Sequence, residues 1–124
     1  MRNRRSTLGQ EKIFADVLDD GSPEVTRWVR IPTKQMPIKY IHGNYNPDFL
    51  VETEDAIYVV EIKEDKKIAD KDKDVFAKAR EARKWCSAVS KSTQKPWVYK
   101  LISHSVINAT DSFEGIVSRA IKFD

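Results

Sequence analysis

Two carboxylates and a lysine stand within the most apolar, strand-like part of the chain. Asp48 follows Pro47 at the start of one β-rich run, and Glu61 and Lys63 end the next run. Charged groups are costly to bury without a partner or a metal ion, so their position needs a chemical reason. Carboxylates are ligands that Mg²⁺ or Mn²⁺ prefers, together with waters and phosphate oxygens. These residues therefore indicate a candidate site for phosphodiester chemistry.

A hairpin would bring the two carboxylates together. Residues 48–52 and 57–63 are short β-rich runs joined by residues 53–56, an arrangement typical of antiparallel strands. The start of the first strand then lies near the end of the second. The two carboxylates, Asp48 and Glu61, then repel each other unless a cation lies between them or one of them is protonated.

The strand geometry also assigns a role to the lysine. Glu61 and Lys63 are two positions apart, so their side chains leave the same face about 6.6 Å apart. We expect Asp48 and Glu61 to hold the cation, with the Ile62 carbonyl as a further ligand, and Lys63 to orient a water or offset negative charge during in-line hydrolysis. The alternative is that these residues are the exposed fringe of a strand and a turn cap, with no chemistry.

Other elements must position these residues. The apolar spacing predicts a helix over Gln10–Leu18, with Glu11 on the same stripe as its apolar residues. Glu11 is then either part of the site or a solvated acid that favours the helix dipole. Alternation over Val25–Ile31 predicts a strand that places Val25 on one face and Trp28 on the other.

The second half of the chain predicts a crossover unit. Residues 64–74 are rich in charges of both signs and predict a solvated connection that becomes a helix at about Asp72 and continues through Val89. A strand over Trp97–Ile102 would lie parallel to residues 57–63. We also expect a short extended piece over 38–41 and a closing helix that begins with a capping box of Asp111 and Glu114.

Composition restricts the class of protein. The 124 residues suit one domain, residues 1–124, with a flexible basic tail at 1–9, and the net charge of +3 permits a polyanionic partner without requiring one. The single cysteine, Cys86, indicates a buried thiol. No stretch is typical of a signal peptide or a membrane span, so we expect a cytoplasmic protein without a membrane partner. His42 and His104 have no partner at ligand spacing and are expected on the surface.

The motif residues resemble those of the PD-(D/E)XK nuclease superfamily, at Pro47-Asp48 and Glu61-Ile62-Lys63. More narrowly, the chain resembles the C-terminal endonuclease domain of the large (Res) subunit of type III restriction enzymes. The Tyr-X-Pro-Asp-Phe string at 45–49, Lys-Trp-Cys at 84–86 and Trp-X-Tyr at 97–99 support that narrower likeness.

The resemblance implies an α/β fold with a restriction-endonuclease-like αβββαβ core, a central mixed sheet, Mg²⁺ dependence and DNA cleavage. Asp48 and Glu61 would be metal ligands, Lys63 the catalytic lysine and Glu11 an auxiliary ligand. Implied partners are DNA, a helicase/ATPase or methyltransferase subunit, and a second copy in a homodimer. Glu64 departs from the narrower family, which often has glycine there.

Three functions stay open at this point. The first is a metal-dependent DNA endonuclease, alone or within a restriction or helicase system. The second is a catalytically inactive nucleic-acid-binding or docking module of the same fold, and the third is a nuclease that acts on RNA or branched DNA. The chain has no Gly-rich nucleotide-binding loop, so no motor is expected within it.

Overall fold

The structure, a computed structural model, describes residues 2–32, 37–40 and 43–123. The larger sheet of these residues has the strand order β1–β4–β5–β6. β1 (Val25–Arg30), β4 (Phe49–Thr53) and β5 (Ile57–Lys63) pair antiparallel in turn, and β6 (Trp97–Ser103) lies parallel to β5. The predicted αβββαβ order and the central mixed sheet are therefore confirmed.

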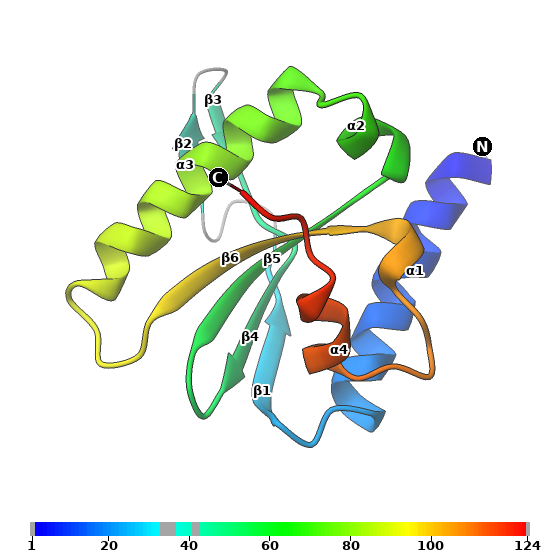
Figure 1. The fold of residues 1–124 in the computed structure, drawn as a ribbon, viewed down its shortest axis with the longest axis horizontal. Coiled ribbons are helices and arrows are strands. Elements are labelled where there is room, and N and C mark those ends of the chain that lie inside the picture. The colour runs from blue at the N-terminus through cyan, green and yellow to red at the C-terminus, as the bar shows by residue number, and fades with distance from the viewer. Residues whose placement is uncertain (1, 33–36, 41–42, 124) are drawn as a thin grey trace.

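Helices cover both faces of this sheet (Figure 1). α1 (Arg2–Asp20) and the short α4 (Phe113–Ser118) pack on one face, and α3 (Lys73–Ser90) crosses the other. A separate two-stranded sheet, β2 (Ile38–Tyr40) with β3 (Gly43–Tyr45), lies against α3. Each face of the central sheet therefore has its own hydrophobic core.

The alternation of β5 divides its side chains between the two cores. Val60 and Ile62 are buried with α1 and α4, whereas Val59 is buried with α3. Glu61 and Lys63 follow Val59 on its face, as the period of two predicts. The second core also contains Cys86, whose pKa is raised to about 12 by burial. The predicted buried thiol is confirmed.

The predicted alternation of the first strand is wrong at its start. Val25 and Trp28 both pack against the α1 core, although they are three positions apart. The register shifts between Val25 and Arg27, and such a β-bulge adds one residue to one strand of a pair. The extra residue moves Val25 to the face of Trp28.

Several element boundaries also differ from the prediction. α1 begins at Arg2 rather than Gln10, so the helix extends into the segment 1–9 that was expected to be a tail. Residues 2–9 contain helix formers and no proline, which permits this extension. β3 was not predicted. Of the extended piece expected over 38–41, residues 38–40 form β2, and Ile41 and His42 lie outside the described residues.

The closing helix is capped by a different residue from the one predicted. Ser112 Oγ accepts a hydrogen bond from Gly115 N at 3.1 Å, whereas the Asp111 carboxylate accepts from Ser112 N and pairs with Arg119. Helix α4 ends at Ser118. The capping box is therefore wrong, because the short Ser side chain occupies the position next to the free N–H groups.

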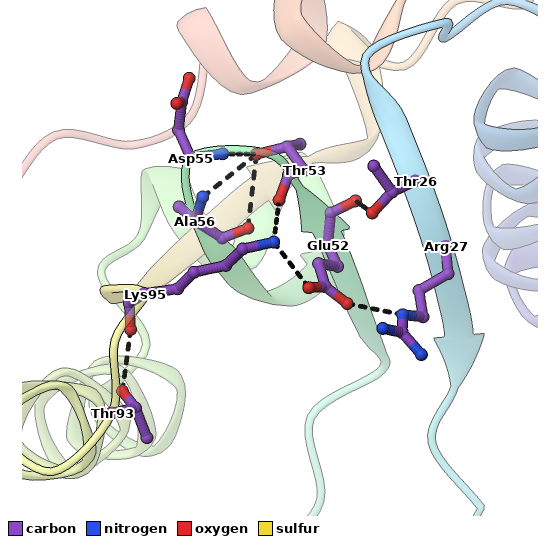
Figure 2. A network of polar contacts seen from close by, with 8 residues as sticks. All are labelled: Thr26, Arg27, Glu52, Thr53, Asp55, Ala56, Thr93 and Lys95. Carbon is purple, nitrogen blue, oxygen red and sulfur yellow. Dashed lines mark hydrogen bonds and ion pairs between the residues drawn. The ribbon is translucent and has the colours of Figure 1, made fainter.

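A polar network closes the end of the sheet at the β4–β5 turn (Figure 2). Lys95 Nζ donates to Glu52 Oε2 and to the Thr53 carbonyl, both at 2.7 Å, and Arg27 Nε donates to the other Glu52 oxygen at 2.7 Å. Lys95 is the main cause of the lowered pKa of Glu52. The network ties the loop before β6 to β4 and β1, at the end of the hairpin away from Asp48.

Among the described helices, none combines the length and the apolar character that crossing a bilayer requires.

Candidate active site

Backbone hydrogen bonds hold Asp48 at the start of β4. Asp48 N donates to the Val60 carbonyl at 3.0 Å, and Ile31 N donates to the Asp48 carbonyl at 2.9 Å. The preceding Pro47 is fully buried. The ladder therefore continues one residue beyond each strand end and fixes the backbone of Asp48 between β1 and β5.

The Asp48 side chain points to the end of β5. Its Oδ2 accepts a hydrogen bond from Ile62 N at 2.8 Å. Ile62 lies directly between Glu61 and Lys63, so this bond brings the carboxylate to the two other motif residues. The hairpin thus unites residues that are thirteen positions apart, as predicted.

Glu61 is the most enclosed charged group of the site. Its side chain is 7% exposed, and its Oε2 lies 3.7 Å from Lys63 Nζ. Its Oε1 is buried and has no hydrogen-bond partner among the described residues. Leaving a buried acceptor unsatisfied costs about 1–3 kcal/mol, and more for a charged group. The oxygen is therefore available to a ligand that the pocket admits.

Burial raises the pKa values of both carboxylic acids. Burial raises the pKa of Asp48 to about 6, against the lowering effect of the Ile62 hydrogen bond. Burial, and then the negative charge of Asp48, raise the pKa of Glu61 to about 8, while Lys63 and Lys78 oppose the rise. At neutral pH this pair has a strong affinity for positive charge, either a proton or a cation.

Glu11 joins the site from α1, but an arginine holds it. Its side chain is 11% exposed and forms an ion pair with Arg30 of β1. The negative charge of Glu11 contributes to the raised pKa of Asp48, so the two groups interact. The helical stripe predicts Glu11 near the site, but no local pattern predicts its partner Arg30, because the helix and the strand meet only in the fold.

One small pocket of about 130 Å³ contains every predicted site residue. Its lining consists of Glu11, Asp48, Glu61, Ile62, Lys63, Glu64, Lys67 and His104. Within the part of the chain that the structure describes, no three His, Cys, Asp or Glu side chains are arranged as a metal-binding group. The close unit is therefore Asp48 with the Glu61–Lys63 pair, and Glu11 lies at its edge with Arg30.

His104 was predicted on the surface, and the structure contradicts that. The residue is half-buried on the 3₁₀ turn η1 (His104–Val106), and its Nε2 is buried without a partner among the described residues. Gln10 of α1 donates to its carbonyl at 2.7 Å. Ser103 pairs with Lys63 in the parallel ladder, so the next residue reaches the pocket. Its position after a strand parallel to β5 was the only available signal.

Two further lining residues come from the segment after β5. Glu64 is half-buried and is the residue before helix α2 (Asp65–Ala69), and Lys67 lies on that helix. Neither belongs to the motif. Glu64, which stands where the narrower family often has glycine, therefore adds an acid at the pocket edge.

Comparison with known proteins adds an independent observation. A protein-family model described as an endonuclease domain matches residues 5–106. Searches of curated proteins and of solved structures found no match. The matched range includes all residues that line the pocket, from Glu11 to His104. The chain therefore belongs to this endonuclease domain family.

Proposed function

We propose that this chain is a divalent-metal-dependent endonuclease that hydrolyses phosphodiester bonds in DNA. The observation that carries the proposal is the buried Glu61 with the half-buried Asp48 and Lys63 beside it, in a pocket whose residues all fall within the endonuclease family match. Placing a second acid beside a buried one is unfavourable for folding alone. The arrangement is understandable if the pair binds a cation.

The donor set fits Mg²⁺ or Mn²⁺. Hard carboxylate oxygens are the preferred ligands of these ions, and the Glu61 Oε1 atom has no partner that would compete among the described residues. We assign Asp48 and Glu61 as ligands, with the Ile62 carbonyl as a further ligand, and Glu11 as an auxiliary ligand that would have to leave its ion pair with Arg30 to reach the ion. When bound, the ion supplies Lewis acidity at phosphorus and stabilises negative charge on the leaving oxygen.

The chain itself supplies orientation and a positive charge. The Ile62 N–H fixes one Asp48 oxygen at 2.8 Å, so this carboxylate is preorganised. Lys63 is 28% exposed and contacts Glu61 at 3.7 Å, so its ammonium group lies between the buried acid and solvent. From there it can donate to the attacking water or to a non-bridging phosphate oxygen.

The finer assignment is the PD-(D/E)XK superfamily, with the endonuclease domain of type III restriction subunits as the nearest type. The buried Pro47 before Asp48 and the adjacent Glu61-Ile62-Lys63 support it. In such a system a helicase/ATPase or methyltransferase subunit would be the partner. With one site per chain, cutting both strands requires a homodimer or two successive nicks.

Plasmid cleavage tests the proposal. Supercoiled DNA should be nicked or linearised with Mg²⁺ or Mn²⁺ and remain intact with EDTA. Asp48→Asn and Glu61→Gln should each lower the rate roughly 100-fold or more, because each removes a charged ligand. Glu54→Gln is the matched control, since Glu54 is exposed in the β4–β5 turn. Cleavage that is equal in all four proteins would refute the assignment.

The same assay separates the alternative functions. Binding of DNA without cleavage under any divalent ion would indicate an inactive module of the same fold. Faster cleavage of RNA, or of branched DNA, than of linear duplex would change the substrate class and leave the site assignment intact.

A further inference from the structure

The segment directly after Lys63 forms one wall of the pocket. Helix α2 follows β5 after a single residue (Figure 1). Its Lys67 lines the pocket. Asp65 anchors the helix, because its carboxylate accepts hydrogen bonds from Ser103 Oγ and, at 3.0 Å, from Ser105 N. These bonds are the main cause of the lowered pKa of Asp65. α2 is thus fixed between the end of β5 and the end of β6.

Folding engages the acids of this segment within the protein. The sequence from 65 to 74 has both signs of charge, but each aspartate has a protein partner. Asp65 binds the serines, Asp70 pairs with Lys66 at 2.9 Å, Asp72 accepts from Asp74 N and Val75 N, and Asp74 accepts from Tyr40 and pairs with Lys78.

Several cations of the same segment have no such partner. Lys67, Lys71 and Lys73 are exposed and form no ion pair or side-chain hydrogen bond with any described residue. Arg80 of α3 is also exposed, and its Nε lies 3.8 Å from Glu81 Oε2. The hydrogen-bonded carboxylates keep their charge, but the fold directs them to protein groups and leaves the ammonium groups of Lys67, Lys71 and Lys73 exposed.

These cations follow one another away from the active site. Lys67 lines the site pocket, and Lys71, Lys73 and Arg80 line a second hollow together with Phe76. We name Lys67, Lys71, Lys73 and Arg80 the basic ridge. It begins at the candidate site and extends over the start of α3.

The backbone at the centre of the ridge is held in a costly conformation. Lys71 has φ of 52°, a left-handed value that glycine adopts far more readily than lysine. Lys71 N donates to the Ile68 carbonyl at 3.1 Å, and Asp72 N donates to the Lys67 carbonyl at 3.0 Å, so the turn is well bonded. Strained non-glycine residues concentrate at functional sites, and this one presents a charge.

We propose that the basic ridge binds the phosphate backbone of the nucleic-acid strand beside the scissile bond. The inference rests on the proposed function, because it names the surface that would hold the substrate of that site. Exposed lysines without protein partners are free to replace the counterions of a phosphate chain. Asp65 keeps α2 in place, so the ridge would fix the register of the strand relative to Asp48 and Lys63.

Fluorescence anisotropy with a labelled DNA duplex in EDTA tests binding apart from cleavage. The ridge variant is Lys67→Gln, Lys71→Gln and Lys73→Gln combined. The control variant combines Lys12→Gln, Lys84→Gln and Lys91→Gln, three exposed lysines outside the ridge with the same total charge change.

The ridge variant should bind about 10-fold or more weakly at 100 mM salt, and the slope of log affinity against log salt should fall by about 2 to 3. The control variant should change affinity less than about 3-fold. Equal loss in both variants, no loss in the ridge variant, or no binding by the unmodified protein would overturn the inference.

The single variant Lys71→Gly covers the case in which the triple variant does not fold. Glycine relieves the left-handed backbone, so the melting temperature should not fall, while the salt slope should fall by about 1. An unchanged slope would count against the ridge. Plasmid cleavage by the unmodified protein is measured separately. If the protein cleaves DNA but the ridge variants bind normally, the ridge is refuted and the nuclease function stands. If binding depends on the ridge but no cleavage occurs, the ridge stands and the nuclease function is refuted.

Discussion

Replacing Glu61 by glutamine should make the metal-free protein more stable above neutral pH. The substitution keeps the shape of the side chain and removes a negative charge that is buried beside Asp48. The same substitution should abolish cleavage. A gain in stability with a loss of activity is the signature of a site that folding maintains at a cost.

The sign and size of the effect follow from the pKa of Glu61. Burial raises it from 4.5 to about 8, so the folded protein binds this proton more tightly than the unfolded chain does. The stabilisation is complete below the unfolded pKa and is lost as the pH rises through the folded pKa. Each pKa unit corresponds to about 1.36 kcal/mol, which sets a ceiling of roughly 5 kcal/mol at high pH.

The expected gain is smaller than this ceiling. Glutamine also loses the contact with Lys63, and its amide needs partners of its own. We expect about 2 kcal/mol at pH 8, or roughly 8 °C in melting temperature for a chain of this size. The pKa of Asp48, raised from 3.8 to about 6, adds to the loss of stability of the unmodified protein between about pH 4 and 6.

Urea unfolding in EDTA from pH 5.5 to 8.5 measures this effect. The unmodified protein and the exposed-site control Glu54→Gln should lose stability together as the pH rises, and Glu61→Gln should lose much less. A Glu61→Gln protein that is less stable than the unmodified one at pH 8.5, or an unmodified protein whose stability does not change with pH, would refute the reasoning.

Two other predictions concern the cation and the far end of the sheet. Addition of Mn²⁺ at pH 8 should raise the melting temperature of the unmodified protein and leave that of Asp48→Asn unchanged; equal shifts in thermal denaturation would place the ion elsewhere. Lys95→Met should lower the melting temperature at pH 7, because Lys95 holds Glu52 and the Thr53 carbonyl. Since Lys95 lowers the pKa of Glu52, the difference in melting temperature between the unmodified protein and Lys95→Met should shrink as the pH falls through that pKa. A difference in melting temperature that stays constant down to about pH 3 would contradict this.

The hairpin and its motif residues could be predicted because their information is local. Alternating apolar residues and a short turn determine which faces meet, so Asp48 and Glu61 had to approach each other. The crossover helix likewise followed from its apolar stripe.

The remaining parts of the site depend on contacts between distant segments. α2 was missed because its position rests on Asp65 binding Ser103 and Ser105, which lie 38 and 40 residues away. The parallel pairing of β6 with β5 was predicted, but the register that sets Ser103 opposite Lys63, and so brings His104 to the pocket, is shown by no local pattern. The partner of Glu11 was hidden for the same reason, since Arg30 reaches it from another element.

The role of the charged residues around α2 also depends on contacts that the sequence does not show. Its sequence has nearly balanced signs, and only the fold shows that Asp65 and Asp72 are bound by backbone and serine groups. These carboxylates keep their charge, but the sequence does not show which lysines of the segment have a carboxylate partner and which are left exposed without one. The basic ridge could therefore be identified only after the hydrogen bonds were known.

The single-turnover rate of DNA cleavage by Lys63→Met tests the central claim most directly. Methionine keeps much of the length of lysine and removes its charge, while Asp48 and Glu61 stay in place. We expect the rate to fall at least about 100-fold, while Mn²⁺ still raises the melting temperature of Lys63→Met. The control Lys84→Met should cut as fast as the unmodified protein. A Lys63→Met protein that cuts DNA at the unmodified rate would contradict it.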